Sequence, residues 1–429
     1  MSKPLFIISC PIDTYSGYGA RSRDLVKSII NLDKYHVKIL PQRWGNTPWN
    51  FIKNNPEWLF LEPHILNTNQ LPQQPDIWAQ ITVPNEFQSV GKYNIGFTAG
   101  IETTICDPSW IEGVNRMDVT FVSSNHAKKV FETSQFENKN TQTQQVEKII
   151  KLEKPVEVLF EGANLDIYKP TTEPCLIDFD IPESFAYLFV GHWMHGELGE
   201  DRKNVGLLVK AFLEVFKNKK TKPALILKTA QVNSSYMDRD ELLNKINQIK
   251  NTVNSTDLPN IYLLHGEFSD EEMNSLYNHS KVKAMISLTK GEGFGRPLLE
   301  FTLSRKPIIA TNWSGHIDFL HPDHSILLGG TLTNVHPSAA SKNMILTESQ
   351  WFSVNHSHVG TALKDVFENY KKYVDAGKRQ AYYSKTNFSF KKMEELLDQL
   401  LTQYLPEFPK QVTLQLPKLD KISLPKKPE

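Results

Sequence analysis

The feature that most constrains the fold of this 429-residue chain is an alternation of short apolar strands with helical segments, which occurs twice. Strand–helix–strand units of this kind build parallel sheets with helices on their faces. The first series is predicted to have strands near residues 5–9, 36–40, 77–83, 93–98, 119–123 and 156–160. The second is predicted to have strands near residues 187–191, 224–228, 261–264, 283–288 and 307–311. The sequence therefore predicts an α/β protein with two doubly wound halves.

The predicted domains follow from these two series. The N-terminal domain is expected over residues 1–170 and the C-terminal domain over residues 171–387, with a hinge in the join near residues 165–184. A final helix within residues 388–408 is expected to return to the N-terminal domain, and residues 409–429, rich in Lys, Leu and Pro, to form a flexible tail. Residues 134–154 and 331–350 are interpreted as excursions of unassigned role. Because ligands of such folds lie at the carboxyl ends of the strands, the site is expected in the cleft between the domains.

Composition argues against several classes of function. Lys+Arg and Asp+Glu both number 48, so no global positive field attracts nucleic acid or an anionic membrane. The three cysteines are scattered, without the spacing of a metal site or a disulfide framework. No apolar stretch reaches the roughly 18 residues that a membrane-spanning helix needs. These features predict a cytoplasmic protein without a transmembrane segment.

The segment of residues 290–300 (KGEGFGRPLLE) carries the most chemical information. Three glycines in five residues allow backbone N–H groups to approach a ligand closely. Pro297 suits the first turn of a helix, whose N-terminus offers unpaired donors to an anion. Glu292 on the loop and Glu300, expected about two turns into the helix, are suited to hold hydroxyl groups on either side of that anion. An anion between two polyhydroxylated groups describes a nucleotide diphosphate sugar.

With further segments, the chain resembles the retaining glycosyltransferases of the two-domain GT-B fold, and among them the large family 4 group. Residues 291–300 (GEGFGRPLLE) match the E-x7-E signature of that family. Residues 16–19 (SGYG) are similar to its N-terminal glycine loop, residues 202–204 (RKN) to its donor-phosphate segment, and residues 265–277 to the strand and loop beside the base. The resemblance implies two Rossmann-like domains that face a cleft, with a C-terminal helix returning to the N-terminal domain.

The resemblance also implies roles for individual residues. Glu292 is expected to contact the transferred sugar and Glu300 to bind the ribose hydroxyls, while Arg202 and Lys203, alternatively solvated loop charges, neutralise the diphosphate. Because Glu292 lies on a glycine loop, its truncation is expected to change stability little. The donor is a nucleotide diphosphate sugar, and no further cofactor is expected. The predicted donor-binding residues are Gly17, Gly19, Arg202, Lys203, His265, Gly266, Gly293, Phe294, Gly295, Arg296 and Glu300.

Some of these residues keep a structural alternative. Gly17 and Gly19 fit a structural turn as well as a ligand loop, since the pair lacks the third glycine of a dinucleotide fingerprint. Glu102 is predicted, with Glu292, as a catalytic residue near the reaction centre or the acceptor, but a turn or capping role suits it equally. His126 is interpreted as a helix-surface residue rather than a catalyst.

A pair of acids, Asp178 and Asp180, resembles the metal-binding D-x-D of the other major glycosyltransferase fold. The pair precedes a predicted strand instead of following one, and it lies in the predicted join between the domains. We interpret it as a solvated linker and expect no metal requirement.

The leading functional hypothesis is a hexosyl- or glycosyltransferase that acts with retention of anomeric configuration. The alternatives are a sugar-nucleotide epimerase on the same scaffold and a catalytically silent nucleotide-sugar-binding module. The acceptor stays open among a glycan, a lipid head group, a protein and, as a minority option, a modified DNA base. UDP-, GDP- and ADP-sugars all fit the predicted grip on phosphate and ribose.

Overall fold

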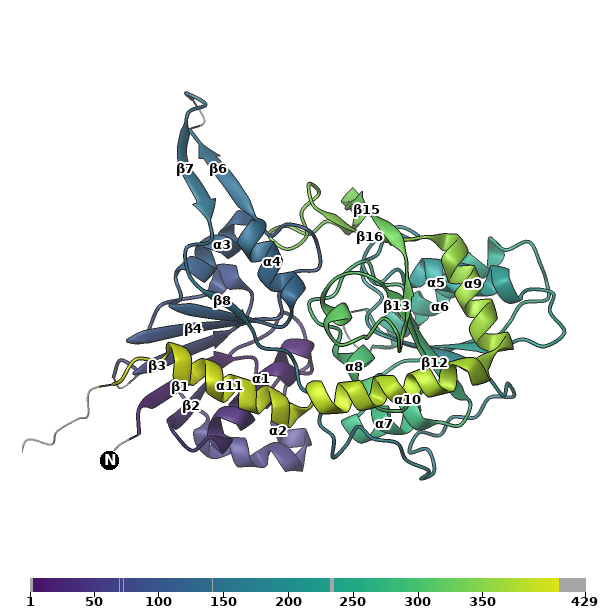
Figure 1. Ribbon diagram of the computed structural model, residues 1–429, viewed down its shortest axis with the longest axis horizontal. Coiled ribbons are helices and arrows are strands. Elements are labelled where there is room, and N and C mark those ends of the chain that lie inside the picture. The colour runs from purple at the N-terminus through teal and green to yellow at the C-terminus, as the bar shows by residue number, and fades with distance from the viewer. Residues whose placement is uncertain (1–2, 69, 72, 141, 232–234, 409–429) are drawn as a thin grey trace, which may run out of the picture.

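The computed structural model describes residues 3–68, 70–71, 73–140, 142–231 and 235–408. The predicted flexible tail, residues 409–429, lies outside the described residues. The described chain folds into two α/β halves, each built on a six-stranded parallel sheet (Figure 1). The predicted pair of doubly wound halves is therefore confirmed.

The N-terminal sheet has the strand order β2-β1-β3-β4-β5-β8, and all neighbouring strands are parallel. Its strands are β1 (Leu5–Cys10), β2 (His36–Pro41), β3 (Ile77–Ile81), β4 (Tyr93–Thr98), β5 (Val119–Val122) and β8 (Val156–Val158). The helices of this half are α1 (Gly17–Asn31), α2 (Phe51–Asn54), α3 (Pro108–Asn115) and α4 (Asn125–Thr133), with 3-10 helices at Pro56–His64 and Pro84–Glu86.

The C-terminal sheet has the order β11-β10-β9-β12-β13-β14, which is the arrangement of dinucleotide-binding sheets. Its strands are β9 (Ala186–Val190), β10 (Ala224–Lys228), β11 (Ile261–Leu264), β12 (Val282–Ser287), β13 (Ile308–Thr311) and β14 (Ile326–Leu328). The helices are α5 (Val205–Phe216), α6 (Tyr236–Asn251), α7 (Asp270–Asn278), α8 (Arg296–Thr302), α9 (His356–Glu368) and α10 (Tyr370–Asn387), with 3-10 helices at Gly315–Asp318 and Pro337–Ala339.

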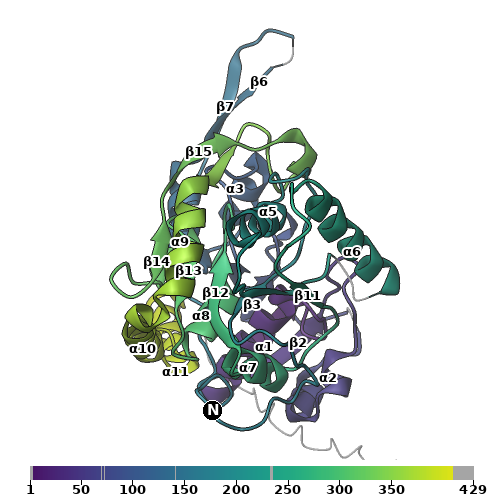
Figure 2. The same ribbon diagram turned by 90° about the vertical axis from the view of Figure 1, so that its right-hand side faces the viewer.

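Helices cover both faces of each sheet, as strands that are apolar on both faces require. In the N-terminal half, α1 packs on one face through Leu25 and Ile29, and α3 packs on the other through Trp110 and Ile111. In the C-terminal half, α5, α6 and α9 belong to one core cluster and α7 and α8 to the other, an arrangement visible around the sheet in Figure 2.

The last helix, α11 (Phe390–Tyr404), leaves the C-terminal half and lies on the N-terminal one (yellow in Figure 1). Its residues Met393, Leu397 and Leu401 are buried in the same core cluster as β1 and α1. The expected return of the C-terminal helix is therefore confirmed.

The chain crosses between the halves at two points that are hydrogen-bonded to each other. Ala163 donates its N–H to the carbonyl of Phe388 at 2.9 Å and accepts from the N–H of Phe390 at 2.8 Å. Beyond this crossing, Tyr168 is buried, and its hydroxyl donates to the carboxylate at the start of α7 at 3.0 Å. The crossover thus lies slightly before the join expected at residues 165–184, because that segment is tied to the C-terminal half.

The first predicted excursion, residues 134–154, contains an antiparallel hairpin, and the second, residues 331–350, runs from the first strand of another hairpin to the start of its second strand. The hairpin of β6 (Gln135–Lys139) and β7 (Val146–Lys151) projects away from the N-terminal half in Figures 1 and 2. The hairpin of β15 (Gly330–Asn334) and β16 (Gln350–Val354) contacts the N-terminal half. There Gln350 and Thr104 exchange two hydrogen bonds of 2.9 Å each.

Candidate active site

The candidate site lies where two central strands of the C-terminal sheet end. The strands β9 and β12 are neighbours although they are not consecutive, so a topological switch point falls between them. The loop after β9 carries Arg202 and Lys203 just before α5, and the loop after β12 carries Glu292. Lys290 donates its N–H to the carbonyl of Arg202 at 2.7 Å, which joins the two loops. The predicted phosphate-binding cations therefore lie beside the predicted catalytic carboxylate.

Glu292 and Lys203 form a buried ion pair between Oε1 and Nζ. Nη1 of Arg202 lies 3.6 Å from Oε2 of Glu292 and 3.8 Å from Oε1 of Glu102, a residue of the N-terminal half. The side chains of Arg202 and Lys203 are only 17% and 13% exposed, so the alternative of solvated loop charges is wrong. Two cations and two carboxylates from three distant segments thus meet at the domain interface.

The cations of this cluster decide the ionisation of Glu292. Burial alone would raise its pKa, but Lys203 and Arg202 outweigh burial and lower the pKa of Glu292 to about 2. Glu292 is only 7% exposed, which contradicts the premise that its truncation would change stability little. Removal of one partner of a buried ion pair leaves the other charge uncompensated and costs about 3–5 kcal/mol. We therefore expect truncation of Glu292 to destabilise the ligand-free protein.

Two glycines of the loop serve a contact between the domains. A Cβ on Gly291 would lie 1.9 Å from the carbonyl oxygen of Glu102, and a Cβ on Gly293 would lie 2.6 Å from that of Ala99. At these two positions, a loop of the N-terminal half, and not a ligand, lies close to the glycine backbone. This packing holds the Glu102 loop against the Glu292 loop.

The start of α8 retains the features expected of an anion site. Gly295 precedes the helix with a φ of +98°, in the left-handed region that favours glycine. Phe294 is buried and packs on Phe319, with ring centroids 5.0 Å apart. Within the described residues, the backbone N–H groups of Phe294 and Gly295 have no protein acceptor. Glu300 is the fifth residue of α8, so it lies about one turn into the helix rather than the expected two.

Glu300 belongs to a second buried charge cluster. Its Oε1 accepts a hydrogen bond from Nε of Arg296 at 2.8 Å, and Nη1 of Arg296 donates to Oδ2 of Asp24 at 2.5 Å. Because Asp24 lies on α1, this network also joins the two halves. Burial raises the pKa of Glu300 to about 7, although Arg296 opposes the shift. The two carboxylates of the motif therefore lie in opposite electrostatic environments.

Gly17 and Gly19 are not part of a loop, contrary to expectation. Both lie in the first turn of α1, which is capped by the hydroxyl of Ser16. A Cβ on Gly19 would lie 2.3 Å from the carbonyl oxygen of Thr14, so packing within the N-terminal half explains this glycine. Gly17 has open space around its α-carbon, and its donor role stays a prediction.

His265 and Gly266 follow β11, at the same edge of the sheet. Nε2 of His265 lies 2.7 Å from Oδ2 of Asp238, and the carbonyl of Gly266 accepts from Nζ of Lys228 at 2.6 Å. In the part of the chain that the structure describes, no hydrogen bond or ion pair joins either residue to Glu292. Their predicted place beside the nucleotide base stays a prediction.

Sequence reasoning missed several residues of the interface. His126, interpreted as a helix-surface residue, lies in α4 and packs edge-on against Trp313 of the other half with ring centroids 4.6 Å apart, so it belongs to the interface rather than to an open helix surface. His316, after β13, is fully buried, and its Nε2 lies 2.6 Å from the carbonyl oxygen of Thr311. For His316, the sequence feature that could have indicated a site is the Ser-Gly-His sequence after a core strand. For Asp24 on α1, the sequence contains no comparable feature.

The acid pair expected in the linker lies before β9, and Asp180 forms an ion pair with Lys281. Among the residues that the structure describes, no group of three or more His, Cys, Asp or Glu side chains is arranged to hold a metal ion. Within the same residues, no helix combines the length and the apolar character needed to cross a membrane.

Comparison with protein families identifies the segment that holds most of this site. Residues 194–345, about a third of the chain, match the family model described as glycosyl transferases group 1. This segment contains Arg202, Lys203, His265, Glu292 and Glu300. No curated protein matches the sequence significantly.

Several solved structures are similar to nearly the whole chain. Sucrose-phosphate synthase from Thermosynechococcus elongatus has a TM-score of 0.60 at 12% identity, over 94% of this chain and 98% of its own. HepE from Anabaena, in complex with UDP and glucose, has a TM-score of 0.59 at 12% identity, over 93% and 100%. A trehalose-6-phosphate synthase, studied for glycosyl transfer with retention, has a TM-score of 0.57 at 12% identity, over 94% and 100%. The likeness confirms the predicted GT-B fold.

Proposed function

We propose that this protein is a glycosyltransferase that moves a sugar from a nucleotide diphosphate sugar to an acceptor hydroxyl with retention of anomeric configuration. The observation that carries the proposal is the meeting of Glu292 with Lys203, Arg202 and Glu102 at the domain interface. The match of residues 194–345 to the group 1 model supports it from the sequence side.

In the proposed donor complex, the diphosphate replaces Glu292 as the counter-ion of Lys203 and Arg202. Glu292 then faces the donor sugar, where positive charge develops at the anomeric carbon during transfer. Glu300 accepts hydrogen bonds from the ribose hydroxyls. Because HepE was solved with UDP and glucose, UDP-glucose is the first donor to test.

The proposed reaction breaks the bond between the anomeric carbon and a phosphate oxygen. A new bond forms from the acceptor oxygen to the same face of the sugar, and the acceptor hydroxyl gives up its proton. We assign Glu102 as the base that accepts this proton, because its carboxylate belongs to the N-terminal half and its side chain is 28% exposed beside Arg202. The acceptor class stays open, as the sequence left it.

We further propose that transfer needs no metal ion, because Arg202 and Lys203 supply positive charge at the diphosphate. Turnover should therefore persist in EDTA. A loss of turnover that magnesium or manganese restores would contradict this assignment.

The test presents UDP-glucose, GDP-mannose and ADP-glucose in turn and measures release of the nucleoside diphosphate. Wild-type protein should turn over one of these donors, and Glu292→Gln should be slower by at least about 100-fold. Proton NMR of the first sugar product should show the anomer of the donor. Donor binding by the wild type without any transfer or hydrolysis would instead favour the silent binding module and overturn the proposal.

A further inference from the structure

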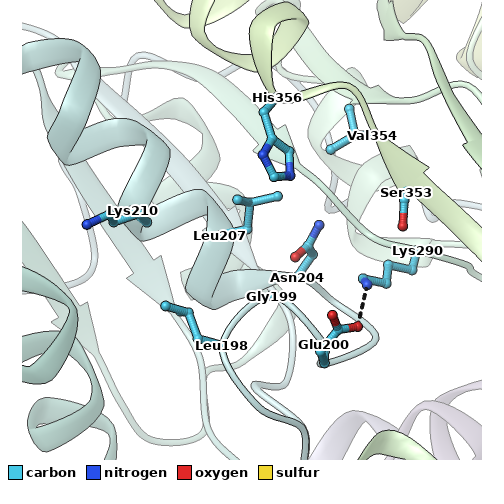
Figure 3. Close-up of a pocket in the computed structure, with 10 residues that line it drawn as sticks. All are labelled: Leu198, Gly199, Glu200, Asn204, Leu207, Lys210, Lys290, Ser353, Val354 and His356. Carbon is cyan, nitrogen blue, oxygen red and sulfur yellow. Dashed lines mark hydrogen bonds and ion pairs between the residues drawn. The ribbon is translucent and has the colours of Figure 1, made fainter. Parts of the chain in front are cut away.

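A separate cavity of about 270 Å³ lies on the C-terminal half, beside the two loops that carry the candidate site (Figure 3). Glu200 and Asn204, from the segment after β9, line it together with Lys290 from the loop after β12 and His356 from the start of α9. Since a water molecule occupies about 30 Å³ of liquid, the cavity has room for one small organic molecule.

Asn204 contributes to this cavity a buried polar group whose hydrogen-bonding capacity the described residues do not satisfy. The residue is only 1% exposed, and its amide oxygen has no hydrogen-bond partner among the described residues. A φ of +56° explains why Asn or Gly stands at this position, but it does not explain a buried amide. The side chain does not cap α5 either, because Val205 N–H donates to Oδ2 of Asp201 at 3.1 Å. A buried acceptor without a partner costs about 1–3 kcal/mol, which a ligand hydroxyl would offset.

The charges around the cavity are already balanced. Nζ of Lys290 lies 3.2 Å from Oε2 of Glu200 and 5.0 Å from the ring centroid of Trp351. Lys210 lies 3.5 Å from Oε1 of Glu214. Each lysine among the described lining residues therefore has a carboxylate partner. A phosphate or carboxylate ligand would find no unpaired positive charge, whereas a neutral ligand suits this lining.

Apolar side chains complete the cavity beside these polar groups. Leu207 and Val354 contribute to its lining, and Figure 3 shows Asn204 between Leu207 and Lys290. A ring molecule with several hydroxyls has donors for Asn204 and Glu200, acceptors for Lys290 and C–H faces for the apolar side chains. Such a mixture of apolar walls and a few placed polar groups is typical of small-molecule sites.

We propose that this cavity binds a small neutral polyol such as a monosaccharide, at a site separate from the donor. Its walls and the candidate active site share two loops: Glu200 and Asn204 flank Arg202 and Lys203, and Lys290 lies two residues before Glu292. Occupation of the cavity should therefore change the affinity of the protein for the donor. This expected coupling rests on the proposed function.

The test uses the full chain with UDP at saturation and saturation-transfer NMR, with glucose, mannose, myo-inositol and glycerol as probes. Sulfate, which has no protons to observe, is the anionic control and is scored by its displacement of the best probe. At least one neutral probe should bind with a Kd of about 1 mM, as expected for so small a ligand. Leu207→Trp and His356→Trp, which fill the cavity from different walls, should each weaken this binding at least about ten-fold. Leu243→Trp, at an exposed leucine of α6, is the matched control and should leave it unchanged.

The outcomes separate the cavity from the proposed function. Absence of binding by every neutral probe, or binding that survives both cavity variants, would overturn the proposed site, as would tighter binding of sulfate than of the sugars. Calorimetry of UDP with and without the best probe tests the coupling, and equal affinities would remove it. Failure of UDP to bind while the probe still binds would count against the proposed function and leave the cavity site supported.

Discussion

The two carboxylates of the 291–300 motif lie eight residues apart, and the molecule treats them in opposite ways. Glu292 faces two cations, Lys203 and Arg202, and its pKa is lowered to about 2 although it is buried. Glu300 shares a single cation, Arg296, with Asp24, and burial raises its pKa to about 7. Sequence spacing therefore determines where the two acids lie, whereas contacts between distant segments determine how they ionise.

This difference suits the two proposed roles. A carboxylate that stays charged at neutral pH can stabilise positive charge at an anomeric carbon. A carboxyl group that titrates near neutrality can exchange hydrogen bonds with hydroxyl groups at little cost in desolvation. Variants of the two acids and of their partners test this difference.

The largest effect on stability is expected from Lys203→Met, which leaves Glu292 buried with a weaker partner. The free energy of unfolding of the ligand-free protein should fall by about 3–5 kcal/mol, as measured by urea denaturation. The double variant Lys203→Met/Glu292→Gln should recover most of this loss, because it removes both charges. Lys378→Met, at an exposed ion pair on α10, is the control and should change stability little. A Lys203→Met protein as stable as the wild type would show that the Glu292 pair is not buried as described.

A smaller effect is expected from Glu300, and it should depend on pH. Because its folded pKa of about 7 exceeds the ordinary value of 4.5, protonated Glu300 stabilises the fold at low pH, and this contribution is lost as pH rises to about 7. The difference in free energy of unfolding between wild type and Glu300→Gln should therefore fall by about 3 kcal/mol between about pH 4 and pH 8. Urea titrations of both proteins across this range measure it. A difference that is flat with pH, or that rises, would contradict the environment assigned to Glu300.

The smallest effect is expected from Asp24→Asn, which weakens the bridge from α1 to Arg296. The loss of a charge-assisted hydrogen bond should cost about 1.5 kcal/mol in unfolding free energy. Because Asp24 contributes to the raised pKa of Glu300, the pH-dependent step of the previous experiment should also move to lower pH in this variant. A step that stays at the wild-type pH would show that Asp24 does not act on Glu300.

The fold and the centre of the site were predictable because both depend on local pattern. Strand and helix periodicity located the two sheets, and parallel topology then brought the ends of β9 and β12 to one edge. Arg202 and Lys203 lie in the loop after β9, just before α5, and Glu292 lies in the loop after β12, so this topology brings them to the same edge of the sheet. Glu102 follows a strand that ends at the same interface, and it reaches Arg202 from the other half.

The other residues of the interface and of the glycine segment depend on contacts between distant parts of the chain, which the periodicity of the sequence does not encode. Asp24 and His126 look in the sequence like ordinary surface residues of helices, but Asp24 is buried and bonded to Arg296 of the other half, and His126 packs against Trp313 across the interface. Gly17 and Gly19 were assigned to a loop because they resemble the N-terminal glycine loop of the family. The cap at Ser16 instead starts α1 at Gly17, and Thr14 approaches Gly19 closely.

The proposed roles of the two acids are compared by measuring turnover and UDP affinity in Glu292→Gln and in Glu300→Gln. Glu292→Gln should keep or strengthen UDP binding, because Lys203 and Arg202 lose a competing counter-ion, and should lose at least about 100-fold in kcat. Glu300→Gln should weaken UDP binding by about ten-fold and lower kcat less. Calorimetry and steady-state kinetics with the donor that the wild type accepts measure both quantities. A Glu292→Gln protein that turns over at the wild-type rate would show that Glu292 does not take part in sugar transfer.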